Sequence, residues 1–302
     1  MKDIIDELLD KNKFQKILPE EYLKFLNQHI IPEYKINNEQ SLQSQTNFKF
    51  WGSIVFIASF LAIAIVGLGI SLYEQIPKLI FIIELIFLVC ILTAFIATRR
   101  SASHNNWINS RLKAEQLRIY IFSIISTKSH IYFESAEDDL KILKKINNKV
   151  QLGEIEDLKE YIIGYWLNTQ KEYHSNKEKN FRKKEEVIKY LIRATYILAI
   201  IVSLLHLFFT SHLYENILIL FVLILPAFGA TLVGIKSHRD YSSISLNSKY
   251  MKEEIDKLIR EIRDSKNYEE LFKTINKIEW LFINELKRWE IIIKSREIEL
   301  GI

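Results

Sequence analysis

The sequence predicts an all-α membrane protein, built as two tandem transmembrane helical hairpins (four spans) with long helical cytoplasmic extensions. Three observations lead to this prediction: a segregated composition, a scarcity of turn-forming residues, and four long apolar runs. Of the 302 residues, 49% are apolar and 26% are charged, so the two classes must occupy different stretches of the chain. Only eight glycines and four prolines are present, which is too few for a fold rich in tight turns.

The four apolar runs mark the predicted spans. The first pair covers residues 50–73 and 79–98, and the second pair covers residues 194–214 and 216–235. About 20 apolar residues are enough to cross a hydrocarbon core of about 30 Å as a helix. The alternative is a buried helix of a soluble protein, but such helices are usually shorter and amphipathic. Runs joined in pairs by very short linkers therefore favour hairpins in a membrane.

Basic residues predict the orientation of the hairpins. The two linkers inside the hairpins carry a single lysine, whereas the other side of the spans carries Lys35, Lys49, Arg99, Arg100, Arg111, Lys113, Lys177, Lys179, Arg182, Lys183, Lys184, Lys189, Arg193, Lys236 and Arg239. By the positive-inside rule, both termini and the central segment are cytoplasmic. The run Arg182-Lys183-Lys184 could alternatively bind a nucleotide or phosphate, but such runs more often set topology and contact anionic lipid.

Short motifs of the first half recur in the second half, in the same order and at a nearly constant offset. The matching pairs are Glu33-Tyr34 with Glu172-Tyr173, Leu72-Tyr73-Glu74 with Leu213-Tyr214-Glu215, and Asn109-Ser110-Arg111-x-x-x-Glu115 with Asn247-Ser248-Lys249-x-x-x-Glu253. Both halves enter and leave the membrane from the cytoplasm, which makes this a parallel duplication and not an inverted repeat of the transporter type. We expect two domains, residues 1–135 and 136–302, each with cytoplasmic helices and one hairpin.

The cytoplasmic segments have the pattern of long helices. Residues 78–128 and 165–225 contain no Gly or Pro, which predicts helices that continue beyond the spans, whereas residues 129–136 are expected to form a break. Asn267 followed by Glu270 predicts a helix start. An apolar stripe follows it at spacings of three and four: Leu271, Ile275, Ile278, Phe282, Leu286, Trp289 and Ile293. We expect Phe282 and Trp289 to pack against other cytoplasmic helices; the alternative is an oligomer face.

No motif for catalysis, a cofactor or a metal is present in the sequence. Gly153 and Gly164 are the only glycines between the hairpins, so neither a phosphate-binding loop nor a dinucleotide fingerprint can be built. The seven histidines are scattered without ligand spacing, and no Gly-x-Ser-x-Gly elbow occurs. The single cysteine, Cys90, excludes an intramolecular disulfide. The net charge of +4 does not indicate nucleic-acid binding. We therefore expect a protein that is not an enzyme.

Polar residues within the predicted spans are candidates for function. Glu84 is the only formal charge there, about 9 Å deep in the second span, and His206 lies about 12 Å deep in the third. If the hairpins pack side by side, the two could pair and lower the cost of burying either. Alternatively, Glu84 lines a conductive path or reaches out toward Lys78. Pro226 predicts a kink in the fourth span. Small residues that permit close helix contact occur in Ala58-x-x-x-Ala62, Gly67-x-x-x-Ser71 and Ala230-x-x-x-Gly234.

A hairpin followed at once by Arg111-x-x-Ala114-Glu115-x-Leu117 resembles the SLATT group. These are bacterial two-transmembrane effector domains that associate with SMODS nucleotidyltransferases and SLOG sensors. The second copy departs from the pattern, with Lys249 in place of the arginine and Lys252 in place of the alanine. The resemblance implies an antiphage or other conflict-system effector that perturbs the bacterial inner membrane when a nucleotide second messenger or a sensor protein triggers it.

The expected function is that of a non-enzymatic, oligomeric effector that opens or disrupts the inner membrane. Its expected partners are the lipid bilayer, further copies of itself and the triggering nucleotide or sensor, with no nucleic acid and no cofactor. Two alternatives remain. One is a passive membrane scaffold that anchors a cytoplasmic partner. The other is a constitutive small channel, which the lack of polar residues in four short spans disfavours.

Overall fold

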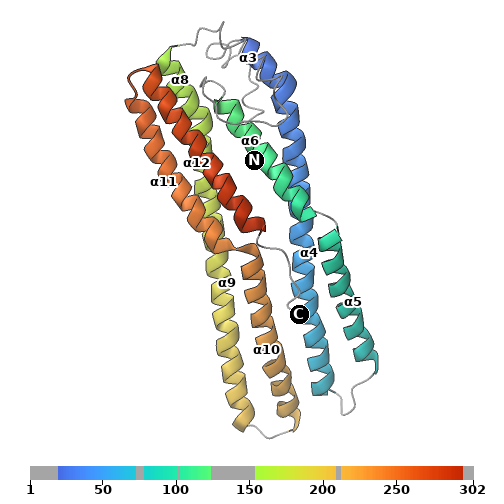
Figure 1. Ribbon diagram of the computed structural model, residues 1–302. Helices are drawn as coiled ribbons and strands as arrows, with labels where there is room; N and C mark the ends of the chain where they lie inside the picture. The colour runs from blue at the N-terminus through green and yellow to red at the C-terminus, as the bar shows by residue number, and fades with distance from the viewer. Residues whose placement is uncertain (1–19, 73–77, 101–102, 124–153, 209–211, 295–302) are drawn as a thin grey trace. The chain divides into compact units, whose positions relative to one another are not determined.

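The computed structural model describes residues 20–72, 78–100, 103–123, 154–208 and 212–294, and these residues are helical with no strand among them (Figure 1). Three stretches, Leu23–Ser71, Ile155–Phe208 and Glu215–Asp264, are long and apolar enough to cross a membrane. Glycine and proline scarcity therefore predicted the all-α class correctly.

Contacts divide the chain into two compact units. The first, here called the polar unit, comprises Met1–Gln43, Asn106–Lys177 and Asn247–Ser295, and the second, the apolar unit, comprises Ser44–Asn105, Glu178–Leu246 and Arg296–Ile302. Each unit takes segments from both predicted repeats, so the contacts group the chain differently from its sequence duplication. The expected domain boundary at residues 135 and 136, and the break expected at residues 129–136, lie outside the described residues.

The order of elements repeats along the chain. A short helix α3 (Glu20–Phe25) and a π-helical segment η1 (Leu26–Ile30) lead into α4 (Ile31–Leu72), which is followed by α5 (Lys78–Arg100) and α6 (Ser103–Ser123). In the same order, α8 (Ile155–Tyr161) and the π-helical segment η2 (Ile162–Leu167) lead into α9 (Asn168–Phe208), α10 (His212–Arg239) and α11 (Tyr241–Asp264). A π-helical segment, a rare element, thus precedes both long helices, and the duplication stays a prediction.

Aromatic stacking lies at the centre of the polar unit. The rings of Phe122 on α6 and Trp166 on η2 stack at 5.1 Å, and Trp166 stacks on Phe282 of α12 (Tyr268–Lys294) at 5.6 Å. Apolar side chains of α3, α4, α8 and α11 complete the core. Stacked rings combine a large buried apolar area with a preferred geometry. The three stacked rings therefore hold together three helical segments that are far apart in sequence.

Helix α12 begins where the sequence predicts. The side chain of Asn267 accepts a hydrogen bond from the Glu270 backbone N–H at 2.9 Å, and the Glu270 carboxylate accepts one from the Lys266 backbone N–H at 2.7 Å. This reciprocal pattern is a capping box, which satisfies N–H groups that have no partner inside the helix. The apolar stripe that follows is buried at Leu271, Ile275, Ile278, Phe282, Leu286 and Ile293, with Trp289 half-buried.

The apolar unit contains α5, α10 and the later parts of α4 and α9. Helices α4 and α10 pack antiparallel, with Gly67 of α4 beside Leu220, and Gly234 of α10 beside Phe56. A Cβ atom at Gly234 would lie 2.5 Å from Cε1 of Phe56, so the contact requires glycine there. At one end of this pair, Arg239 of α10 donates a hydrogen bond to Oγ of Ser53 at 2.7 Å.

Helix α9 packs on α10. Gly229 of α10 lies against the ring of Tyr196 on α9. The chain from residue 78 to residue 123, expected as one continuous helix, is assigned as α5 and α6 on either side of residues 101–102, which lie outside the described ranges.

The capping box gives a local test of the polar unit. The substitution Asn267→Ala removes the cap and is expected to cost about 1 kcal/mol at the start of α12. Amide hydrogen exchange of residues 268–271 should then become about fivefold faster. Asn284→Ala, an exposed position within the same helix, is the matched control and should leave this exchange unchanged. Equal exchange in the two variants would contradict the capping role.

Candidate functional site

A cluster of charged side chains is buried inside the polar unit. It is built on α6, where Glu115 forms ion pairs with Arg111, one turn before it, and with Arg118, one turn after it. Glu115 is 7% exposed. A carboxylate so poorly solvated persists in its charged form only when cations replace the lost water, and two guanidinium groups do so here. We call Arg111, Glu115, Arg118, His174, Lys177 and Glu285 the charge cluster.

The ion pairs set the ionisation of the groups on α6. Burial by itself would raise the pKa of Glu115, but the charges of Arg111, Arg118 and Lys177 outweigh burial and hold that pKa below its ordinary value. Burial likewise opposes the charge on Arg111, but Glu115, together with smaller contributions from Tyr173, Tyr34 and Glu285, outweighs burial, so the pKa of Arg111 is raised. Both groups therefore stay charged at neutral pH, and the attraction between them stabilises the charged forms.

Two further helices bring His174 and Glu285 to the cluster. The amide of Asn247 on α11 donates a hydrogen bond to one oxygen of Glu285 on α12 at 3.1 Å. The other oxygen lies 3.8 Å from Nε2 of His174 on α9. Burial, with the charges of Lys177 and Arg118, lowers the pKa of His174 to about 3, and burial raises the pKa of Glu285. His174 is therefore neutral at physiological pH, so this contact is not an ion pair.

Several buried polar atoms of the polar unit lack a hydrogen-bond partner among the described residues. Nδ1 of His174, Oε1 of Gln170 and Oγ of Ser248 are buried without a hydrogen bond. Gln170 precedes His174 by one turn of α9, so the two share a helix face. A partly satisfied buried network is costly compared with a fully satisfied one. The cluster joins α6, α9 and α12, and Asn247 of α11 is bound to its Glu285. It is sensitive to protonation, but it contains no paired nucleophile and base.

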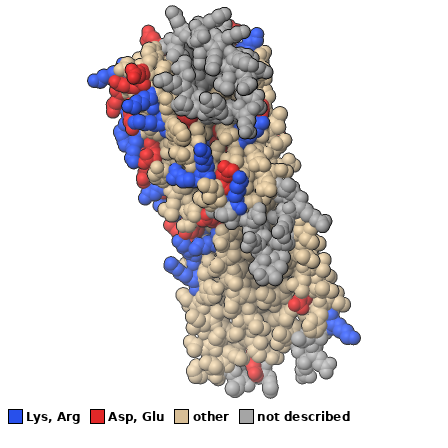
Figure 2. Space-filling model, in the orientation of Figure 1, with Lys and Arg blue, Asp and Glu red and all other residues tan. Residues whose placement is uncertain are grey.

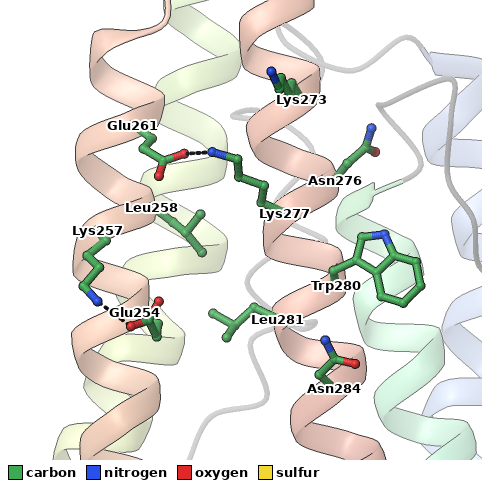
Figure 3. Close-up of a pocket in the computed structure, with 10 residues that line it drawn as sticks. All are labelled: Glu254, Lys257, Leu258, Glu261, Lys273, Asn276, Lys277, Trp280, Leu281 and Asn284. Atoms are coloured by element: carbon green, nitrogen blue, oxygen red, sulfur yellow. Dashed lines mark hydrogen bonds and ion pairs between the residues drawn. The ribbon is translucent and has the colours of Figure 1, made fainter.

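An open groove of about 420 Å³ lies between α11 and α12, and Figure 3 shows the side chains that line it. Two ion pairs line it, each at 2.6 Å: Lys277 of α12 with Glu261 of α11 across the groove, and Lys257 with Glu254 along α11. Trp280 is 50% exposed, and Leu258 and Leu281 also line the groove. Among the described residues, no group of three or more His, Cys, Asp and Glu side chains could hold a metal ion. The groove has the chemistry of a surface for a partner segment.

The two copies of the repeated motif have different environments. Arg111 and Glu115 of the first copy belong to the charge cluster, whereas Lys249 and Glu253 of the second copy are exposed on α11 and form no ion pair with each other in the described part of the chain. Of the two predicted packing residues, Phe282 is buried in the core, and Trp289 makes an edge contact with Trp107 at 5.6 Å. Both contacts are made within the polar unit.

The predicted intramembrane residues stay apart from the cluster. Glu84 on α5 and His206 on α9 are each half-exposed, and neither has a hydrogen bond or ion pair with another described residue. Pro226 lies inside α10, which is assigned as one helix from His212 to Arg239, and the kink stays a prediction. Sequence reasoning missed Arg118, His174 and Glu285. Only the place of Glu285 between Phe282 and Trp289, next to the apolar stripe, could have indicated burial.

The pKa of His174 predicts a pH dependence of stability. A histidine with a lowered pKa gains its proton on unfolding, so its contribution to stability falls as pH drops below 6.5, the ordinary value, toward 3. Between pH 6.5 and pH 5 the loss reaches about 2 kcal/mol. Glu285, with its raised pKa, acts in the opposite direction, so the test compares variants. Thermal unfolding of the full chain should lose less stability from pH 7 to pH 5 in His174→Asn than in the wild type; equal losses would contradict the assignment.

Similarity to known proteins gives no further guide to this site. Comparison of the chain with protein-family models, with curated proteins and with solved structures finds no match. The interpretation of the charge cluster and of the groove therefore rests on the burial, distances and charges of their own side chains. These describe a helical protein with an extensive apolar surface and a polar unit that contains a buried charge cluster.

Proposed function

We propose that the chain is a non-enzymatic, multi-pass protein of a bacterial inner membrane that acts as a membrane-perturbing effector. The apolar unit is its membrane-spanning part, with four spans arranged as two hairpins. The polar unit is its cytoplasmic part and receives the triggering signal. Support comes from the surface of the apolar unit, from the composition of its helices, and from the resemblance of the Arg111 to Leu117 segment to the SLATT group.

The exposed apolar side chains of the apolar unit carry the proposal. On α9, Ile200 is 62% exposed and Phe208 is 79% exposed, and α5 exposes Leu79, Phe81 and Leu85 to a similar degree. Figure 2 shows that the visible surface over the later part of α9 and over α10 is almost free of Lys, Arg, Asp and Glu. Soluble monomers rarely expose apolar patches beyond a few hundred Å². Hydrocarbon is the solvent that suits such a surface.

Helix α5 is proposed as a membrane span in addition to the three long apolar stretches described above. This helix runs from Lys78 to Arg100, and at a rise of 1.5 Å per residue it is long enough for a hydrocarbon core of about 30 Å. Its side chains are exposed around most of its circumference, as lipid contact on a peripheral helix requires. With α4, α9 and α10 it completes two hairpins, and the basic residues outside the hairpins place both termini in the cytoplasm.

The helices α4 and α9 supply residues to both units. Residues up to Gln43 of α4 and up to Lys177 of α9 belong to the polar unit, and the residues after them belong to the apolar unit. The charge cluster lies partly on α9, through His174 and Lys177. A change in the cluster therefore acts on a helix that also enters the membrane. This connection is the proposed route from a cytoplasmic signal to the bilayer.

A passive scaffold is the second candidate function. The groove between α11 and α12, with the half-exposed Trp280 at its edge, favours it, because an exposed aromatic side chain beside apolar and charged groups is typical of a protein-binding surface. A scaffold would bind its partner without changing membrane permeability. The two functions therefore differ in one measurable property, the membrane potential.

Regulated expression in a bacterium with a membrane-potential dye tests the effector function. Wild-type protein, expressed with the neighbouring genes of its own genome, should depolarise the membrane. Gly234→Leu, which places a side chain against Phe56, should abolish depolarisation by separating α4 from α10. Ala230→Leu, at an exposed position one turn away, is the matched control and should keep it. An unchanged potential with wild-type protein inserted in the membrane would refute the effector function and favour the scaffold.

A further inference from the structure

The outermost helices of the apolar unit belong to different hairpins. Contacts at Gly67 join α4 to α10, and contacts at Gly229 join α10 to α9. Figure 1 draws these helices across the page in the order α9, α10, α4 and α5. The unit therefore has α9 at one side and α5 at the other, and each of these two helices exposes a large apolar surface.

One of these surfaces carries a carboxyl group. Glu84 lies on α5, six residues after its start at Lys78, which corresponds to about 9 Å along the helix. The side chain is half-exposed, and its neighbours Phe81 and Leu85 are more than half exposed. No other described residue forms a hydrogen bond or an ion pair with Glu84. A carboxyl group at this depth in hydrocarbon is costly unless it finds a polar partner.

The other surface carries an imidazole. His206 lies on α9, two residues before its end at Phe208, or about 3 Å along the helix. The depth of about 12 Å expected from the sequence was counted from Tyr214 and is wrong, because α10 already begins at His212. It is half-exposed between Leu205 and Leu207, both exposed, and it too has no hydrogen bond or ion pair with a described residue. Counted from the start of α5 and from the end of α9, which would lie on the same side of the membrane, Glu84 is deeper than His206 by about 6 Å. Two extended side chains can bridge this difference.

We propose that α5 of one copy packs against α9 of the next copy, with the carboxyl of Glu84 on the imidazole of His206. The proposal rests on the proposed function, because both helices must cross the same membrane. The two groups are complementary, since an imidazole N–H donates to a carboxyl oxygen, and neither has a partner among the described residues of its own chain. The carboxyl and the imidazole thus satisfy each other across the interface.

The contact is head-to-tail and leaves one unused surface on each side of the pair. The first copy still exposes its α9, and the second copy still exposes its α5. Contacts of this kind add further copies until the rotation closes a ring. Four helices in one copy enclose no pore, whereas a closed ring of copies surrounds a central space. The interface therefore provides the assembly that a membrane-perturbing effector needs.

Cysteine cross-linking in native membranes tests the contact. Cys90, the only cysteine of the chain, is first replaced by alanine. The double variant Glu84→Cys with His206→Cys should form, with a flexible bismaleimide cross-linker, a ladder of dimers, trimers and larger species; the offset between the two positions calls for this longer reagent, because a disulfide needs Cα atoms within about 7 Å. Each single variant should stay monomeric. Glu84→Cys with Phe221→Cys, which moves the second cysteine to an exposed site on α10, is the matched control and should also stay monomeric.

The possible outcomes distinguish whether lipid or another copy of the protein covers the exposed surfaces of α5 and α9. A monomeric double variant overturns the contact and leaves α5 and α9 to lipid, with Glu84 reaching toward Lys78. Dimers without larger species overturn the head-to-tail arrangement. Cross-linking of the single Glu84→Cys variant overturns the pairing with His206, because it places α5 against α5.

Exchange of the two groups provides a second test, which does not depend on cysteine chemistry. By native mass spectrometry in nanodiscs, Glu84→Leu should reduce the fraction of oligomer about threefold to tenfold, a range that follows from the energies of polar contacts between membrane helices. The double variant Glu84→His with His206→Glu should restore it; failure to restore it overturns the contact. A ladder without depolarisation supports the interface and refutes the effector function, whereas depolarisation without a ladder does the reverse.

Discussion

The large exposed apolar surface of the apolar unit is the constraint on which the remaining features of the protein depend. Side chains such as Ile200 and Leu207 are more than half exposed over long stretches of α5 and α9. Without water, the backbone groups must be satisfied inside each segment, which allows only helices here. Helix pairs in lipid gain little from the hydrophobic effect and depend on close packing, which Gly234 provides between α4 and α10.

The polar unit obeys the opposite constraint, because its charges must find partners where water is excluded. The duplicated motif shows the consequence. Helix α6 is buried at five of six consecutive positions, from Leu117 to Phe122, whereas α11 buries only one face. On α6 the motif residues Arg111 and Glu115 are paired within the charge cluster. On α11 the corresponding residues are solvated, and a lysine is sufficient in place of the arginine. The two copies of the motif therefore differ in sequence where they differ in burial.

Sequence patterns predicted those structural features that depend on residues close together in the chain. Helical structure followed from the lack of Gly and Pro, and the start of α12 followed from Asn267 and Glu270, which form the expected capping box. The charge cluster could not be predicted in the same way. His174 and Arg118 lie on polar helix faces, and a local pattern cannot distinguish a solvated face from one covered by another polar helix. The π-helical segments η1 and η2 also lack a local signature. The four spans and their orientation stay proposals.

Collision accessibility of nitroxide labels tests most directly whether hydrocarbon covers the apolar unit. In a Cys90→Ala background reconstituted into lipid bilayers, labels are placed at Ile200 and Val202 of α9, which are exposed and buried, and at the exposed Trp280 of the polar unit. We predict that the label at position 200 collides with oxygen but not with a water-soluble nickel complex. The label at position 202 should collide with neither, and the label at position 280 should collide with the nickel complex. Equal collision with nickel at positions 200 and 280 would contradict the account.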